Sequence, residues 1–169
     1  MGLFIPDYMC ETIYDIPISF FENNGIKHIF LDIDNTLVSY DTPTPTGQNI
    51  EWFNKLRDSG IDICLVSNND EKRVKTYASG LDIEYISDAH KPLTGAYKSL
   101  MTNKGIDRKT VCAVGDQIFT DVLAAKLIGA KAVKVSPVKA VENTFFRIKR
   151  FFEVPFVKYY LFKHRKDNI

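Results

Sequence analysis

The chain has 169 residues, of which 45% are hydrophobic and 25% charged, and its formal net charge at pH 7 is +1. This length suits one domain with a single core, and the composition excludes a disordered chain. No apolar run reaches the ~18–20 residues that a membrane-spanning helix needs, and no signal peptide is evident, so we expect a cytoplasmic protein.

The chain begins with a segment, residues 1–25, that predicts an irregular arm with one short helix over 19–24, ended by Gly25. The core, residues 26–136, alternates apolar runs with amphipathic stretches. Strands are expected over 27–31, 62–66, 83–86, 110–114 and 131–135, and helices over 48–59, 70–78, 94–102 and 118–128. This alternation predicts an α/β fold with a doubly wound, parallel, five-stranded sheet. The gaps between these elements are too short for a cap domain. Residues 137–169 form a tail of the same single domain.

Two carboxylates, Asp32 and Asp34, follow the first apolar run where its strand is expected to end. In α/β sheets, ligands bind at the carboxyl ends of the strands. Carboxylates this close repel each other unless a proton or a cation lies between them, and Mg2+ prefers oxygen ligands. An isolated Asp-x-Asp is also common in solvated loops, so the interpretation depends on the rest of the chain.

Polar residues also follow the next three expected strands. They are Ser67 and Asn68 after the second strand, Lys91 after the third, and Asp116 after the fourth, with Asp121 at the start of the next helix. Because the carboxyl ends of parallel strands meet at one edge of a sheet, we expect all of these residues to converge with the first two carboxylates.

Three of these residues also have purely structural interpretations. Ser67 is placed to begin a helix cap, Lys91 is compatible with a solvated surface lysine, and Asp121 suits the first turn of a helix. Their coincidence at one edge of the sheet favours a functional site over three separate structural roles.

The pattern as a whole resembles the four motifs of the haloacid dehalogenase (HAD) superfamily. The matching residues are Asp-x-Asp-x-Thr at 32–36, Ser67, Lys91 before Pro92, and Gly-Asp-Gln-x-x-Thr-Asp at 115–121. In detail the chain is similar to subfamily IIIA and to its YqeG-type phosphatases, and the segment Pro6-Asp7-Tyr8 and the basic aromatic tail share this similarity.

The resemblance implies a Mg2+-dependent phosphatase that works through an aspartyl-phosphate. Asp32 would be the nucleophile, and Asp34 the general acid and then the general base. Asp32, the main-chain carbonyl of Asp34, and Asp116 would hold the metal. Superfamily phosphatases carry Asp at the position of Asp34, whereas transport ATPases carry Thr, so this residue favours hydrolysis.

The resemblance also implies roles for the remaining polar residues. Ser67, the main-chain amide of Asn68, and Lys91 would neutralise the phosphoryl oxygens. Asp121 would support the metal shell and orient Lys91, and Thr36 would brace the loop after the first strand.

The tail differs from the rest of the chain in charge and composition. Residues 137–169 carry eight Lys/Arg, three Asp/Glu and eight Phe/Tyr, whereas the preceding residues have a net charge of −4. Apolar residues recur at helical spacing, at Val141, Phe145, Ile148 and Phe152. Pro155 is expected to break that helix. Cations follow at Lys163, Arg165 and Lys166.

Three interpretations of the tail remain open: a helix packed on the domain, an interfacial anchor, and a nucleic-acid-binding strip. Aromatic side chains beside cations suit the surface of an anionic membrane, and nucleic acid is the least favoured partner. We therefore predict peripheral contact of residues 139–166 with the inner face of the membrane. The oligomeric state is not predictable.

A site without a cap suits a large phosphorylated substrate. The YqeG-type proteins are similar to a mitochondrial phosphatidylglycerophosphate phosphatase, which makes a phospholipid headgroup the leading substrate; a soluble, protein or nucleic-acid phosphate ester is the alternative. A phospho-receiver module also uses clustered aspartates and Lys-Pro, but there Lys-Pro follows the last strand, and here Lys91-Pro92 precedes Gly-Asp-Gln. A binding module without activity is disfavoured because no expected catalytic residue is missing.

Overall fold

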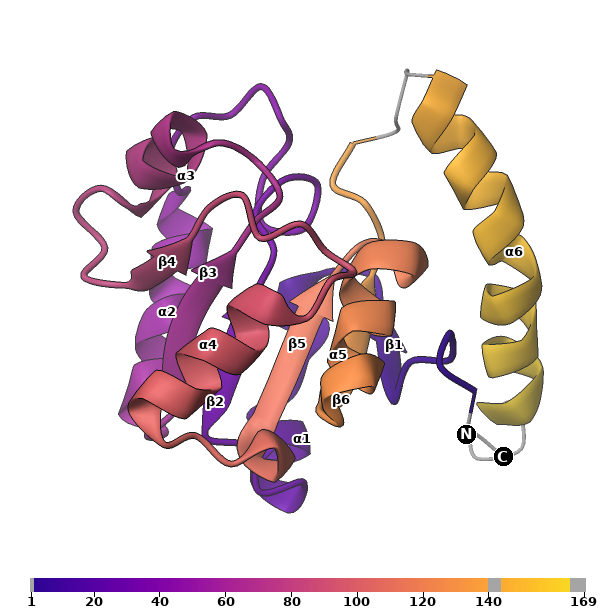
Figure 1. The fold of residues 1–169 in the computed structure, drawn as a ribbon, viewed down its shortest axis with the longest axis horizontal. Coiled ribbons are helices and arrows are strands. Elements are labelled where there is room, and N and C mark those ends of the chain that lie inside the picture. The colour runs from indigo at the N-terminus through magenta and orange to yellow at the C-terminus, as the bar shows by residue number, and fades with distance from the viewer. Residues whose placement is uncertain (1, 140–143, 165–169) are drawn as a thin grey trace.

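A parallel sheet of six strands forms the centre of the protein, as the computed structural model of residues 2–139 and 144–164 shows (Figure 1). Its strand order is β1-β6-β5-β2-β3-β4, and every neighbouring pair is parallel. The strands are β1 (Tyr8–Cys10), β2 (His28–Leu31), β3 (Asp62–Val66), β4 (Glu84–Ile86), β5 (Val111–Gly115) and β6 (Lys131–Val135).

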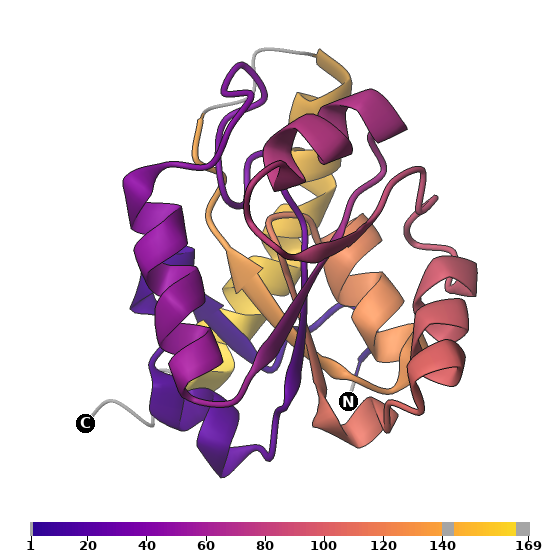
Figure 2. The same ribbon diagram turned by 90° about the vertical axis from the view of Figure 1, so that its left-hand side faces the viewer.

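Helices cover both faces of the sheet, with α1 and α2 on one side and α4 and α5 on the other (Figure 2). The longer helices are α1 (Ile18–Asn23), α2 (Gly47–Asp58), α3 (Glu71–Ala78), α4 (Gly95–Lys104), α5 (Leu123–Ile128) and α6 (Thr144–His164). Three short helical turns are η1 (Ile13–Asp15), η2 (Arg108–Thr110) and η3 (Ile118–Val122), the last of which is π-helical. Across the described residues no cap domain is inserted, so the predicted doubly wound, capless α/β fold is confirmed.

Strand β2 shows how the sequence builds the two cores. Successive side chains of a strand point to opposite faces of the sheet. Ile29 and Leu31 accordingly pack into the core under α2, whereas Phe30 packs into the core under α4 and α5. All three are buried, which explains why the sequence presents a continuous apolar run here rather than an alternating one.

The prediction of five strands is wrong by one, because the N-terminal arm contributes β1. This strand has only three residues and pairs with β6 at the edge of the sheet. Its residues are half-buried and show no alternation that a sequence pattern could reveal. Side-chain contacts hold it in place instead: Asp7 Oδ2 accepts hydrogen bonds from the Lys126 ammonium (2.6 Å) and the Ala132 main-chain N–H (2.8 Å).

Helix α6 runs beside β1 at this edge of the sheet (Figure 1). Tyr160, which is buried, accepts a hydrogen bond from the main-chain N–H of Met9 (3.1 Å), so the helix covers the edge strand. The expectation that Pro155 ends the helix is wrong. The helix continues because Phe156 and Val157, just beyond the proline, pack against the core with Phe4 and Phe119.

Part of the predicted tail lies outside the described residues, namely Val141, Arg165 and Lys166, together with the side chain of Phe145. In the described part of the chain, no helix is both long and apolar enough to cross a bilayer.

Candidate active site

The candidate site lies at the carboxyl ends of β2, β3 and β5, where the sequence places its polar residues. After β2 the chain turns sharply: the main-chain N–H groups of Thr36 and Leu37 both donate to the carbonyl of Ile33 (3.2 and 2.9 Å). Asn35 adopts a left-handed conformation (φ 62°), which asparagine tolerates better than most residues. This turn brings Thr36 back to Asp32, whose Oδ2 accepts a hydrogen bond from Thr36 Oγ1 (3.2 Å).

Lys91 lies at the centre of the site. Its ammonium donates to Asp32 Oδ1 (2.6 Å) and to Asp121 Oδ1 (2.7 Å), and all three side chains are buried. Burial lowers the pKa of Lys91, but the carboxylates of Asp121 and Asp32 outweigh burial and raise this pKa well above its ordinary value. The lysine is therefore a permanent cation within an otherwise acidic cluster.

Asp116 completes this cluster with Asp32 and Asp121. The three residues each offer a carboxylate oxygen, and these oxygens lie within 4.8 Å of one another. Burial, together with the neighbouring Asp121, raises the pKa of Asp32 to about 7 and that of Asp116 to about 6, despite the lowering effect of Lys91 and Arg150 respectively. The three carboxylates of the cluster pair with two cations, Lys91 and Arg150.

Asp34 lies close by in sequence, but its carboxylate turns to a different partner. Asp34 Oδ1 accepts hydrogen bonds from both Nε (3.1 Å) and Nη2 (2.8 Å) of Arg73, and Oδ2 accepts one from Asn69 Nδ2 (3.1 Å). The metal role expected of Asp34 concerns its main-chain carbonyl, and this role stays a prediction.

Asp70 caps α3, since its side chain accepts from the main-chain N–H of Arg73 (2.8 Å). The amide of Asn69 is thereby free to bind Asp34.

Ser67 and Asn68 approach the site from the end of β3. Ser67 is buried, and its Oγ accepts a hydrogen bond from the main-chain N–H of Asn69 (3.0 Å). The side chain of Asn68 clamps the main chain of Lys91, accepting from its N–H (2.6 Å) and donating to its carbonyl (3.0 Å). Asn68 therefore links β3 to the loop that carries the lysine, a contact beyond the main-chain role predicted for it.

The sequence did not point to three other charged residues at the site. Arg73 binds Asp34, as described above. Arg150, from α6, pairs with both the carboxylate and the main-chain carbonyl of Asp116, and Glu153, one turn further on, pairs with Arg150 (2.9 Å). The spacing of Arg150 and Glu153, i and i+3 on one helix, was the only available signal, and many exposed ion pairs share it.

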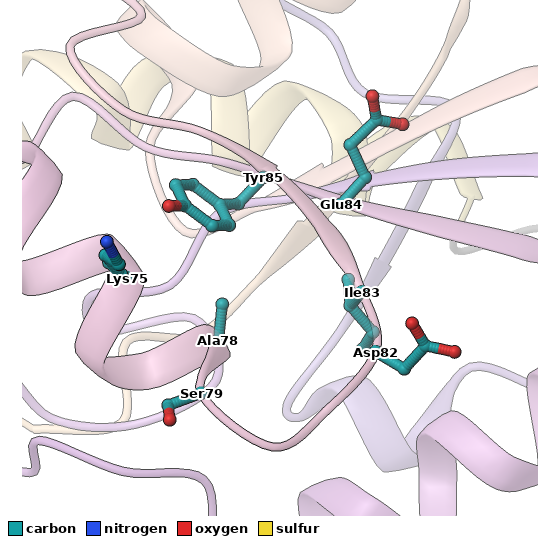
Figure 3. Close-up of a pocket in the computed structure, with 7 residues that line it drawn as sticks. All are labelled: Lys75, Ala78, Ser79, Asp82, Ile83, Glu84 and Tyr85. Atoms are coloured by element: carbon teal, nitrogen blue, oxygen red, sulfur yellow. The ribbon is translucent and has the colours of Figure 1, made fainter.

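A concave region separate from the candidate site lies between the end of α3 and the start of β4 (Figure 3). It is lined by Lys75, Ala78, Ser79, Asp82, Ile83, Glu84 and Tyr85. None of the predicted site residues lines it, and it lies by the amino end of β4 rather than at the carboxyl ends of the strands.

Comparison with known proteins identifies the family. Residues 1–139 match a family model described as "Mitochondrial PGP phosphatase". The chain is also 35% identical over 147 residues to the "Probable phosphatase YqeG" of Bacillus subtilis (strain 168), a match that covers 87% of this chain and 86% of that protein.

Solved structures with the same fold include two phosphatases. One is the cobalt-bound deoxy-D-mannose-octulosonate 8-phosphate phosphatase of Haemophilus influenzae, with a TM-score of 0.55 and 18% identity over 75% of each chain. The other is the 3-deoxy-D-manno-octulosonate 8-phosphate phosphatase of Moraxella catarrhalis, solved with magnesium, phosphate and KDO; its TM-score is 0.50 and its identity 22%, over 59% of this chain and 63% of that one. The chain therefore belongs to the family described as mitochondrial PGP phosphatase, and it is a phosphoric monoester hydrolase of the YqeG type.

Proposed function

We propose that this phosphatase uses Mg2+ to hydrolyse a phosphate monoester on a phospholipid headgroup, with phosphatidylglycerophosphate as the leading substrate. The observation that carries the proposal is the combination of a capless aspartate site with an adjoining helix, α6, whose outer face is aromatic and cationic. The description of the matching family model supports this choice of substrate.

The aspartate cluster suits a hard divalent cation. Its three carboxylates offer oxygen ligands of the kind that Mg2+ prefers. Among the described residues, Asp116 Oδ1 is the buried side-chain oxygen that lacks a hydrogen-bond partner, and a bound cation would satisfy it. We propose that Asp32, Asp116 and the main-chain carbonyl of Asp34 hold the ion, with Asp121 supporting them. When bound, Mg2+ supplies charge neutralisation for the phosphoryl oxygens.

Asp32 is the proposed nucleophile. Its carboxylate oxygen attacks the phosphorus atom, forming a P–O bond to Asp32 as the bond to the leaving oxygen breaks. Lys91 (2.6 Å) and Thr36 (3.2 Å) hold its two oxygens, so the side chain is oriented before the substrate arrives. The product of this step is an aspartyl-phosphate and a free alcohol.

Asp34 is the proposed acid and base. It gives a proton to the departing oxygen, and it then takes a proton from the water that attacks the phosphorus of the aspartyl-phosphate, releasing inorganic phosphate and regenerating Asp32. Arg73 and Asn69 fix the carboxylate of Asp34 beside the site. Because Arg73 pairs with the ionised form, this pair must loosen when Asp34 carries the proton.

Ser67, the main-chain amide of Asn68, and Lys91 are the proposed contacts for the remaining phosphoryl oxygens. Asn68 and Asp121 both position Lys91, one through its main chain and the other through its ammonium. A phosphate arriving beside Lys91 would meet a cation that is already fixed in place.

The outer face of α6 supports a membrane-bound substrate. Phe151 and Phe162 are 72% and 76% exposed, and exposed apolar residues accompany them along the helix: Ile148, Phe152, Val154, Tyr159 and Leu161. The exposed charges on this helix are the cations Arg147, Lys158 and Lys163, whereas its one acidic residue, Glu153, is buried. Aromatic groups beside cations suit the headgroup region of an anionic bilayer.

A phosphate-release assay with Mg2+ across lipid, nucleotide, sugar and peptide phosphates tests the proposed function. We expect the highest kcat/KM with phosphatidylglycerophosphate presented in anionic vesicles. Preference for a soluble sugar, peptide or nucleic-acid phosphate would contradict the lipid assignment while leaving the phosphatase chemistry in place.

A further inference from the structure

Helix α6 contacts the aspartate cluster through the side chain of Arg150. Its guanidinium donates from Nη2 to Asp116 Oδ2 and from Nη1 to the main-chain carbonyl of the same residue. The side chain of Arg150 is 22% exposed and that of Asp116 is fully buried, so this ion pair is largely shielded from water. The family model ends at residue 139, and α6 therefore lies beyond the segment that it matches.

Glu153 fixes the arginine from the same helix. Glu153 Oε2 accepts from Arg150 Nη1 (2.9 Å), and Oε1 accepts from the main-chain N–H of Ile118 (2.7 Å). Glu153 is itself buried. Arg150 thus binds Asp116, and Glu153 binds Ile118, two residues further along the chain. Together they join α6 to the loop that carries Asp116, the proposed metal ligand.

The two carboxylate oxygens of Asp116 differ in their contacts. Arg150 occupies Oδ2, while Oδ1 is buried without a hydrogen-bond partner. A buried carboxylate oxygen without a partner is costly, so this arrangement indicates a position kept for a ligand. Carboxylates that bind metals are commonly held by a hydrogen bond to their other oxygen.

We infer that Arg150 is a positioning residue for the metal site: it holds Oδ2 and the main chain of Asp116 so that Oδ1 stays available to a divalent cation. This inference rests on the proposed function, in which Asp116 is a Mg2+ ligand. It assigns the inner face of α6 to the metal site, in addition to the proposed membrane contact of its outer face.

The experiment is a calorimetric titration of the full-length, metal-free protein with Mg2+. We expect Arg150→Met to weaken Mg2+ affinity by about 10–100-fold, the usual effect of removing an outer partner of a metal ligand. Arg150→Lys should recover only part of the affinity, because an ammonium lacks the planar fork that contacts both oxygens. Arg147→Met is the matched control, since Arg147 is exposed one turn earlier on the same helix, and it should bind Mg2+ like the wild type.

Glu153→Gln provides a second test if Arg150→Met does not fold. The glutamine keeps an acceptor for the Ile118 N–H but loses the charge that fixes Arg150, so affinity should fall by a smaller factor. Turnover with a soluble ester at saturating Mg2+ should recover in the Arg150 variants, since the residue acts through the metal.

The outcomes separate the inference from the proposed function. If the wild type binds Mg2+ and Arg150→Met binds it equally well or more tightly, Arg150 does not position Asp116, and tighter binding would mean that the guanidinium competes with the ion. If the wild type itself does not bind Mg2+, the proposed metal chemistry fails and the inference fails with it.

Discussion

Gly115 and Asp121 are so close that no side chain fits between them. A Cβ atom at Gly115 would lie 2.2 Å from Cγ and 2.4 Å from Oδ2 of Asp121. Glycine at this position therefore allows the end of β5 to approach the carboxylate that binds Lys91.

Gly115→Ala should displace Asp121 and break its ion pair with Lys91. We expect a loss of phosphate release together with about 1–3 kcal/mol of stability, the usual cost of overpacking a core position. Urea unfolding and a phosphate-release assay measure the two effects. Gly95→Ala is the control, because its Cβ would meet no atom within 4 Å and its φ is not positive. Equal activity of both variants would show that the position of Asp121 is unimportant.

Asp34→Asn should lower turnover by ~10²–10⁴-fold, the usual contribution of general acid–base catalysis. The amide cannot transfer the proton, although it keeps the shape of the side chain. Asp41→Asn, an exposed aspartate in the following loop, serves as the control and should be fully active. An Asp34→Asn enzyme with wild-type kcat would exclude Asp34 as the acid.

The stability of the metal-free protein should decrease as pH rises from about 4 to about 7. Burial raises the pKa of Asp32 to about 7 and that of Asp116 to about 6, from an ordinary value of 3.8. In this range the folded state binds more protons than the unfolded chain, so their release on raising the pH favours unfolding. Urea unfolding in EDTA at about pH 5 and about pH 8 measures the effect. Asp32→Asn should reduce the pH dependence, and an unchanged slope would contradict this explanation.

Mg2+ should stabilise the protein most at the higher pH, where the carboxylates are ionised and repel one another. The midpoint of thermal unfolding at about pH 8 should rise with Mg2+ concentration, whereas NaCl at matched ionic strength should have little effect. A midpoint that does not respond to Mg2+ would mean that the cluster does not bind the ion.

Replacing Phe151 and Phe162 together by Ser should reduce co-sedimentation with anionic vesicles. Both side chains are more than 70% exposed, so their loss should leave the core intact. Hydrolysis of a small soluble ester should be unchanged, and wild-type binding should weaken as salt rises, because the Debye length falls from ~10 Å at 0.1 M to ~3 Å at 1 M. Leu127→Ser, an exposed apolar residue on α5, is the control. If the wild-type protein does not co-sediment with anionic vesicles at low salt, the proposed membrane contact is wrong.

Local patterns in the sequence predicted most of the fold and the edge of the sheet at which the candidate site residues converge. The apolar runs of β2, β3 and β5 end in Asp32, Ser67 and Asp116, and in a parallel sheet those ends must share an edge. Strand β1 could not be predicted this way, because three half-buried edge residues leave no periodic signal. The continuation of α6 through Pro155 depends on tertiary packing of Phe156 and Val157, which outweighs local propensity.

The sequence could not predict the charged partners of the aspartates either, because the paired residues are far apart along the chain. Arg73 follows Asp34 by 39 residues, and Arg150 follows Asp116 by 34. No local pattern encodes such a pairing, which exists only once α3 and α6 have packed beside the sheet. Asp32, Asp34 and Asp116 follow the ends of strands, whereas the packing of α3 and α6 brings Arg73 to Asp34 and Arg150 to Asp116.

Phosphate release by the wild type and by Asp32→Asn, each with saturating Mg2+ and with EDTA, tests the proposed mechanism most directly. An amide at position 32 can neither attack phosphorus nor bind the ion as a carboxylate does. We expect Mg2+-dependent release by the wild type, none after chelation, and none by Asp32→Asn, whose circular dichroism should show an intact fold. Phosphate release by a folded Asp32→Asn protein at the wild-type rate, or by the wild type after complete chelation, would contradict the proposed mechanism.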